Sequence, residues 1–358
     1  MLATERLHRL GQSLWLDDIT RDLLDSGTLE SYIAKWSVTG LTSNPSIFDH
    51  AITHTASYDR DIARLLGKGA KGEELFFELA ILDLSRAADL FRPIHQRTAT
   101  VDGWVSLEVS PLLAHDTQRT VASAASLFAK ADRPNLFIKI PGTKEGLPAI
   151  EEAIFRGVPI NVTLLFSPEQ YVAASEAYLR GLERRVERRL PPDVRSVASV
   201  FISRWDRAVA DTVSDKLKNR LGLAIGKVAY KAYRDHLDSD RWQRLASVGA
   251  RAQRLLFAST STKDPKASDV LYVDGLAAPN TVNTMPQNTL KATADHATAG
   301  GTLSRDGGDG ALVLGEFEKA GVGIAGLAER LQNDGAADFV KSWRDLLGAI
   351  DAKSKTLV

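Results

Sequence analysis

The sequence of 358 residues contains no cysteine, which excludes disulfide bonds, thiolate metal sites and a cysteine nucleophile. It also has no excess charge of either sign, because 45 Lys and Arg residues balance 45 Asp and Glu residues. Proteins that bind nucleic acid through many phosphates usually carry a basic excess, so we expect no nucleic-acid partner. No run approaches the roughly 20 apolar residues needed to cross a bilayer, so we expect no membrane partner.

The composition that remains is typical of a large globular protein. Hydrophobic residues make up 44% of the chain and charged residues 25%, enough for a core without covalent support. Residues 1–11 have the spacing of an amphipathic helix and not the apolar core of a signal peptide, so we expect a cytoplasmic protein. The seven histidines show no metal-ligand spacing, and we expect no metal and no cofactor.

Short apolar runs alternate with longer helical patterns along the chain. Eight runs are expected to form strands, at residues 13–17, 38–42, 104–109, 136–140, 160–166, 196–202, 254–259 and 270–274. Helical patterns separate them, most clearly at 117–131, 168–190 and 204–233. This alternation predicts parallel strands with helical crossovers, and eight units favour a closed (β/α)8 TIM barrel over an open doubly wound sheet.

The chain is longer than such a barrel requires. A bare barrel needs about 250 residues, so about a hundred are left over. We expect one barrel domain over 1–358, with extra helices in an insertion after the second strand, at about 46–98, and in a C-terminal extension, at about 280–358. The glycine-rich stretch 299–310 lacks the Lys-Ser/Thr pair of a phosphate-binding P-loop, and we expect a plain loop there.

The segment Asn135-Leu-Phe-Ile-Lys-Ile-Pro-Gly-Thr143 places a lysine inside an apolar strand. On a period of two, Lys139 shares the inward face with Phe137, while Ile138 and Ile140 face the helices. Burial disfavours the ammonium form, and a neutral amine can attack a carbonyl to form a Schiff base. Taken alone, the pattern fits equally well a structural lysine that pairs with a carboxylate or reaches water.

Three other strands carry a polar side chain near their C-terminal ends, namely Asp17, Glu108 and Thr163. In a parallel barrel these ends meet at one rim, where catalytic groups lie. Two carboxylates, one amine and one hydroxyl at that rim favour acid/base chemistry around an imine. For each carboxylate the alternative is an N-cap of the following helix, and Asp18 competes with Asp17 for either role.

Three motifs resemble those of the transaldolase family, in particular its longer actinobacterial subfamily and the transaldolase part of transaldolase/phosphoglucose-isomerase fusions. They are Thr39-Gly-Leu-Thr-Ser-Asn-Pro-Ser46, Phe137-Ile-Lys-Ile-Pro141 and Asn161-Val-Thr-Leu-Leu-Phe-Ser167, and the likeness extends from Leu14 to Pro286. The resemblance implies a (β/α)8 barrel and a transferase of carbohydrate metabolism, in the non-oxidative pentose phosphate pathway. Such an enzyme moves a dihydroxyacetone unit from sedoheptulose 7-phosphate or fructose 6-phosphate to glyceraldehyde 3-phosphate or erythrose 4-phosphate.

The resemblance also implies a role for individual residues. Lys139 matches the Schiff-base lysine, Asp17 the acid/base residue at the C4 hydroxyl, and Glu108 and Thr163 the pair that holds a water. The residues that the resemblance implies for substrate binding are Asn44, Asn161, Ser199, Phe201, Arg204, Ser259 and Lys263. Of these, Arg204 matches the phosphate-binding arginine. Lys263 follows Ser259 where the short subfamily has a second arginine, and the register there differs.

Two alternatives stand beside this interpretation. A fructose-6-phosphate aldolase resembles the chain in fold and lysine, but carries a glutamine where this chain has Glu108 and a tyrosine where it has Phe201, so these two residues favour a transaldolase. The alternative from another class is a barrel that binds sugar phosphates without turnover. The expected partners are small sugar phosphates, and the sequence is compatible with either a monomer or a homodimer.

Overall fold

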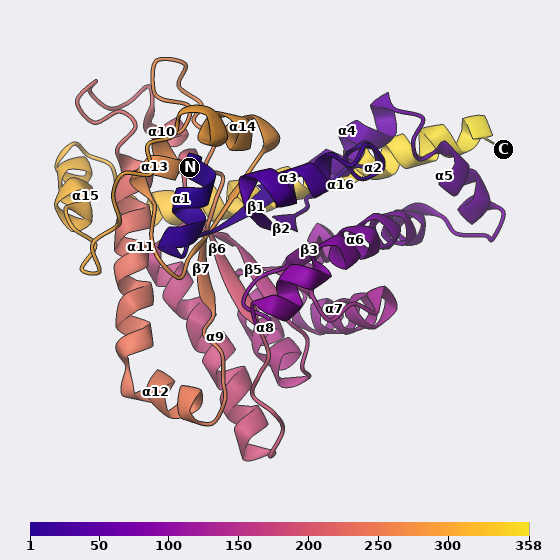
Figure 1. Ribbon diagram of the computed structural model, residues 1–358, viewed down its shortest axis with the longest axis horizontal. Helices are drawn as coiled ribbons and strands as arrows, with labels where there is room; N and C mark the ends of the chain where they lie inside the picture. The colour runs from indigo at the N-terminus through magenta and orange to yellow at the C-terminus, as the bar shows by residue number, and fades with distance from the viewer. Residues whose placement is uncertain (358) are drawn as a thin grey trace.

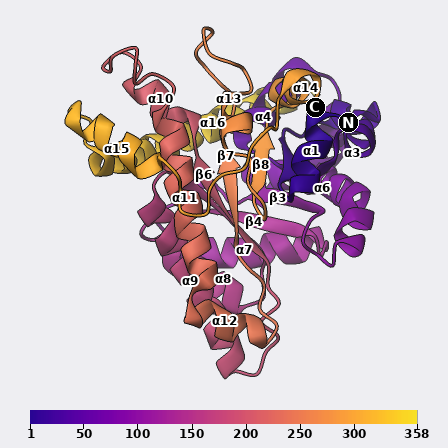
Figure 2. The ribbon, with the colours of Figure 1, turned by 60° about the vertical axis from the view of Figure 1, so that its left-hand side comes forward.

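The computed structural model describes residues 1–357 and contains a closed barrel of eight parallel strands (Figures 1 and 2). Each strand pairs with the next along the chain, and the last pairs with the first. The predicted (β/α)8 barrel is therefore confirmed. The strands are β1 (Ser13–Asp17), β2 (Val38–Thr42), β3 (Trp104–Glu108), β4 (Leu136–Pro141), β5 (Ile160–Leu165), β6 (Ser196–Phe201), β7 (Arg254–Ala258) and β8 (Val282–Met285).

Helices surround the barrel, and several begin at side chains that cap their first turn. Asn44, Asp116 and Ser167 each accept a hydrogen bond from a backbone N–H three residues on. The helices are α1 (Ala3–Leu10), α2 (Arg21–Asp25), α3 (Thr28–Trp36), α4 (Pro45–His54), α5 (Asp59–Leu66), α6 (Gly72–Arg97), the short 3-10 helix η1 (Pro111–Leu113), α7 (Thr117–Ala131), α8 (Gly146–Phe155), α9 (Pro168–Glu187), α10 (Ser203–Val209), α11 (Leu221–Asp238), α12 (Asp240–Ser247), α13 (Leu271–Gly275), α14 (Gln287–His296), α15 (Gly310–Lys319) and α16 (Ile324–Leu357).

The eighth strand does not lie where the sequence pattern put it. Residues 270–274 run into the short helix α13, and β8 is Val282–Met285. A run of four apolar residues followed by an aspartate fits one helical turn as well as a strand, and β8 is only four residues long, with both of its middle residues polar. Because β8 and α14 complete the barrel, the C-terminal extension begins after residue 296 and not at 280.

The helical pattern at 204–233 is two helices, and not one. The chain leaves α10 at Val209 and enters α11 at Leu221. The break is held by Asp206, whose carboxylate oxygens accept hydrogen bonds from the backbone N–H groups of Leu221 and Gly222, each at 2.9 Å. A buried carboxylate at a helix start satisfies N–H groups that have no partner within the helix.

Aromatic side chains fill the barrel interior. The ring of Phe137 stacks on Trp104 with centroids 4.1 Å apart and lies 6.2 Å from Trp15. Gly40 leaves the necessary room, since a Cβ there would lie 2.7 Å from the Trp15 ring. Lys139 lies two residues after Phe137, on the same face of β4. The inward direction predicted for the lysine is therefore confirmed.

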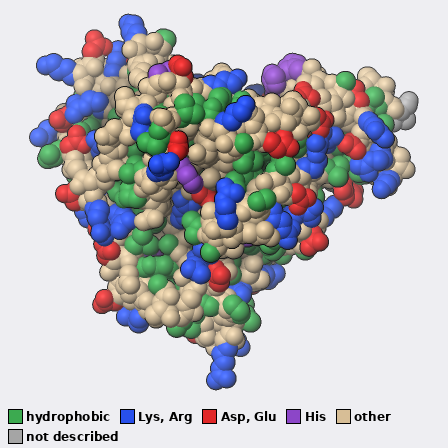
Figure 3. Space-filling model, in the orientation of Figure 1, with side chains coloured by type: hydrophobic (Ala, Val, Ile, Leu, Met, Phe, Trp, Pro, Cys, Tyr) green, Lys and Arg blue, Asp and Glu red, His purple; other side chains and the backbone are tan. Residues whose placement is uncertain are grey.

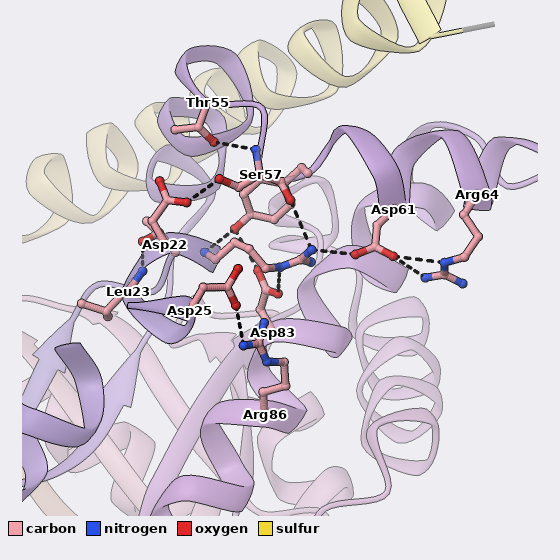
Figure 4. A network of polar contacts seen from close by, with 12 residues as sticks. Asp22, Leu23, Asp25, Thr55, Ser57, Asp61, Arg64, Asp83 and Arg86 are labelled. Atoms are coloured by element: carbon pink, nitrogen blue, oxygen red, sulfur yellow. Dashed lines mark hydrogen bonds and ion pairs between the residues drawn. The ribbon is translucent and has the colours of Figure 1, made fainter. Parts of the chain in front are cut away.

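Extra helices follow β2 and end the chain, as the sequence pattern predicted, although the C-terminal set begins later than expected. Helices α4, α5 and α6 occupy the stretch after β2, and Figure 1 shows the C-terminal helix α16 running beside α4. The Trp343 ring of α16 packs edge-on against Phe76 of α6, with centroids 4.9 Å apart. Asp61 and Asp83 belong to a polar network that joins α2, α5 and α6 (Figure 4).

Within residues 1–357, no helix combines the length and apolar character that crossing a bilayer would require.

Candidate active site

A cavity of about 180 Å³ opens at the carboxyl ends of the strands. In (β/α)8 barrels this is the rim that carries the chemistry. Eight residues singled out in the sequence line the cavity: Asp17, Asn44, Lys139, Thr163, Ser199, Phe201, Arg204 and Ser259. The parallel pairing of the strands thus brings together side chains that are up to 242 positions apart in the chain.

Lys139 lies on β4 and is 5% exposed. Its Nζ donates a hydrogen bond to the Ser43 carbonyl oxygen at 3.3 Å and lies 3.5 Å from the Glu108 carboxylate. The Phe339 ring of α16 lies over it, with its centroid 5.6 Å from Nζ. The amine is therefore enclosed on several sides and faces the cavity.

Glu108 is the direct cross-strand neighbour of Lys139 in the β3–β4 pair. Burial raises the pKa of Glu108 to about 7, although the Lys139 charge acts to lower it. Among residues 1–357, neither the Glu108 oxygens nor the buried Thr163 hydroxyl has a hydrogen-bond partner. Buried polar atoms without a protein partner are suited to binding a small polar molecule beside the amine.

Asp17 and Asp18 have different surroundings. Asp17 lines the cavity, and its Oδ1 accepts a hydrogen bond from the Thr42 hydroxyl at 2.8 Å. Asp18 instead accepts a hydrogen bond from Gln287 of α14, and burial raises its pKa. The N-cap of α2 is Thr20, so neither carboxylate is needed as a helix cap.

The two asparagines expected to bind substrate differ in their position relative to the cavity. Asn44 is the N-cap of α4 and uses its Oδ1 for Ile47 N and the Ser46 hydroxyl, so its side-chain NH₂ remains available to the cavity that it lines. Asn161 is fully buried and does not line the cavity. It lies behind Ser199, whose hydroxyl donates to Asn161 Oδ1 at 2.7 Å, and it therefore orients that serine.

The residues expected to bind phosphate do not all lie at the cavity. Arg204 lines the cavity and lies against the Phe201 ring, 5.5 Å from its centroid, and burial lowers the pKa of its guanidinium. Ser259 also lines the cavity. Lys263 does not: it is exposed in the loop after β7, where its Nζ donates to Ser261 Oγ at 3.2 Å. The structure thus brings one of the two expected phosphate-binding cations to the cavity.

Helix α16 contributes cavity residues that the sequence reasoning missed, namely Asp338, Phe339 and Ser342. They lie in an amphipathic helix without a recognisable motif, and no periodicity shows where such a helix docks. Thr42 and Thr284 were also missed. Thr42 stands two residues before Asn44 in one of the quoted motifs, so its position in the motif could have indicated it.

Within residues 1–357, no group of three or more His, Asp or Glu side chains is placed to hold a metal ion.

Comparison with known proteins gives a consistent set of relatives. The family described as Transaldolase/Fructose-6-phosphate aldolase matches residues 14–350. A protein named Transaldolase from Thermobifida fusca is 45% identical over 355 residues, which cover 97% of this chain and 96% of that protein. A Transaldolase from Saccharopolyspora erythraea is 43% identical, covering 97% and 96%. A Transaldolase 2 from Nostoc punctiforme is 39% identical, covering 98% and 97%.

Proposed function

The chain belongs to the transaldolase/fructose-6-phosphate aldolase family and is a transaldolase, and we propose that its reaction proceeds through a Schiff base on Lys139. The observation that carries the proposal is the enclosed amine itself. Lys139 is buried at the catalytic rim, faces the cavity and lies 3.5 Å from a carboxylate that is also buried. A desolvated amine beside a proton acceptor is the arrangement that carbonyl attack requires.

In the first half-reaction, Lys139 Nζ attacks C2 of the ketose phosphate, and the C2 oxygen leaves as water to give a protonated imine. Asp17 then takes the proton of the C4 hydroxyl. The C3–C4 bond breaks, its electron pair moves toward the imine to form an enamine, and an aldose phosphate leaves. The protonated imine lowers the barrier because it accepts the electron density that would otherwise remain on carbon.

The second half-reaction reverses these steps with another aldehyde. Carbon C3 of the enamine attacks the acceptor carbonyl, and Asp17 returns its proton to the oxygen that becomes the new C4 hydroxyl. Water held by Glu108 and Thr163 then adds to C2 of the imine and frees the product ketose and Lys139. Transfer prevails over hydrolysis only while water is kept from the enamine, and the Phe339 ring over Lys139 supports such exclusion.

The remaining polar side chains hold the substrate. We propose that Asn44 and Ser199 bind hydroxyls of the dihydroxyacetone unit, with Asn161 orienting Ser199, and that Arg204 and Ser259 bind the phosphate. The proposed partners are the sugar phosphates of the pentose phosphate pathway, in the cytoplasm, and neither nucleic acid nor a membrane. Figure 3 shows basic and acidic side chains interspersed over one face, which supports small-molecule partners.

A coupled assay with and without erythrose 4-phosphate tests the proposed function. With fructose 6-phosphate as donor, we expect steady formation of glyceraldehyde 3-phosphate only when erythrose 4-phosphate is present. Release of free dihydroxyacetone at an equal rate without the acceptor would instead identify an aldolase. Absence of product under both conditions would identify a barrel that binds without turnover.

Glu108→Gln is expected to change the pH dependence of imine formation. In the wild type the pKa of Glu108 is about 7, so the carboxylate that activates water is populated above pH 7 and is lost below it. The rate of borohydride trapping should therefore rise through pH 7 in the wild type and remain flat there in the variant. We also expect the ratio of aldol cleavage to transfer to increase, since the aldolases that the chain resembles carry glutamine at this position.

The exposed variant Glu318→Gln is the matched control, because it removes one carboxylate far from the barrel mouth, on α15. It should keep both the pH profile and the cleavage ratio of the wild type. An unchanged profile and ratio in Glu108→Gln would remove Glu108 from the handling of water.

A further inference from the structure

Helix α16 places a carboxylate against the proposed phosphate-binding arginine. Asp338 Oδ2 lies 3.2 Å from Arg204 Nη1, and both residues line the cavity. Among the described residues, the cavity-lining cations are Lys139 and Arg204, and the cavity-lining anions are Asp17 and Asp338. Because Lys139 has to react as an amine, Arg204 is the cation left for a phosphate, and in the free enzyme it already has an anionic partner.

The position of Asp338 is a consequence of how α16 docks. Gln332 donates hydrogen bonds to the carbonyl oxygens of Gly142 and Leu164, at 3.1 and 2.9 Å, and so attaches the helix to the ends of β4 and β5. Leu164 has a φ of 58° at a register shift in the β5–β6 pair, which leaves its carbonyl free of the strand ladder. The helix is thus anchored at Gln332, less than two turns before Asp338.

A glycine allows the close approach. A Cβ on Gly335 would lie 3.1 Å from Leu164 Cδ2 and 3.4 Å from Arg204 Nη1, so a larger residue would require these side chains or α16 to shift by a few tenths of an ångström. Beyond Asp338, the Trp343 indole donates to the Glu73 carboxylate of α6 at 2.9 Å. Asp338 is therefore held beside Arg204 by contacts on both sides, and its pairing does not depend on a mobile chain end.

We propose that Asp338 sets the affinity for phosphate by competing with the substrate phosphate for Arg204. The inference depends on the proposed role of Arg204 as the phosphate-binding residue. The Arg204 side chain is 27% exposed and packs on Phe201, whereas the Asp338 side chain is 66% exposed and has space to turn into solvent. When a phosphate binds, Asp338 gives up its ion pair and remains near a second anion, which lowers the affinity.

This competition acts on every phosphorylated ligand. The donor, the acceptor and both products carry a phosphate, so a bare arginine would also retain the products. Partly exposed ion pairs of this kind change an equilibrium constant by up to about five-fold. Asp338 thus sets the strength of phosphate binding without touching the carbon atoms that react.

The test compares Asp338→Asn with Asp334→Asn. Asp334 lies on the same exposed side of α16, one turn earlier, and contributes only a longer-range charge to Arg204. For Asp338→Asn we expect KM for fructose 6-phosphate and the inhibition constant of inorganic phosphate to fall about three-fold. Asp334→Asn should stay close to the wild type. Unchanged or higher constants in Asp338→Asn, or an equal fall in both variants, would overturn the proposal.

Two further measurements separate this inference from the proposed function. Binding of inorganic phosphate to Lys139→Met, with and without Asp338→Ala, is followed by calorimetry and does not require turnover. The alanine variant should bind phosphate more tightly, and equal affinity contradicts the competition. Arg204→Met should abolish inhibition by phosphate. If inhibition persists in that variant, the proposed role of Arg204 fails. If Arg204→Met abolishes inhibition but Asp338→Asn leaves the constants unchanged, only the role of Asp338 is refuted.

Discussion

Lys139→Met is expected to lose the covalent adduct with fructose 6-phosphate completely and to lower transaldolase activity by about 10⁴-fold or more. Methionine has a similar length and fits the space of a side chain that is 7% exposed, but it offers no nitrogen for the imine. Without that nitrogen, no group in the cavity accepts the electron pair of the C3–C4 bond. The measurement is borohydride reduction with fructose 6-phosphate, followed by mass spectrometry of the peptide that contains residues 135–143.

The control for this experiment is Lys144→Met, since Lys144 is exposed in the loop that follows β4. It should retain the adduct on Lys139 and wild-type activity, and both variants should keep the far-ultraviolet circular dichroism of the wild type. An adduct on another lysine, or no adduct in an active preparation, would contradict the Schiff-base assignment.

The sequence predicts this site well where strands carry it. A strand alternates its side chains between two faces, so the aromatic Phe137 on the inner face also determines the direction of Lys139 two residues later. The same rule applies to Trp15 and Asp17 on β1. Parallel pairing then brings strand ends from the whole chain to one rim, and no knowledge of the loops is needed to expect these side chains in one cavity.

The sequence does not predict a site residue whose position depends on the path of a loop or on where a helix packs. Lys263 follows the last residue of β7 by five positions, and the path of such a loop is not determined by any period; the lysine points to Ser261 and stays outside the cavity. Asp338 belongs to a helix whose amphipathic pattern shows that one face is buried, but not against which surface. The short β8 was missed because the apolar run at 270–273 resembled a strand more closely.

Asp83→Ala is expected to lower the free energy of unfolding by about 3–5 kcal/mol, because it leaves a buried guanidinium without its main partner. The Asp83 side chain is fully buried on α6. Its Oδ1 accepts a hydrogen bond from Arg21 Nε at 2.6 Å, and its Oδ2 accepts one from the Tyr58 hydroxyl at 2.8 Å. Burial raises the pKa of Asp83, and the Arg21 charge and the two hydrogen bonds act in the opposite direction.

Loss of the Asp83 carboxylate is also expected to affect the active site, because its partner Arg21 lies close to Asp17 in the chain. This residue begins α2, four positions after Asp17, and its guanidinium also pairs with Asp61 of α5 at 2.6 Å. The network therefore fixes α2 against α5 and α6 behind the end of β1 (Figure 4). We expect Asp83→Ala to lose transaldolase activity on mild heating before the wild type does.

Asp25→Ala is the matched control, because the Asp25–Arg86 pair of the same region has a similar distance, 2.6 Å, but side chains that are 54% and 46% exposed. Water replaces a lost partner there, so the change in urea-induced unfolding should stay below about 1 kcal/mol. The double variant Arg21→Met/Asp83→Leu should recover much of the loss, since it removes both buried charges together. If Asp83→Ala were no more sensitive to urea than Asp25→Ala, the buried network would not be what holds α2 behind the catalytic aspartate.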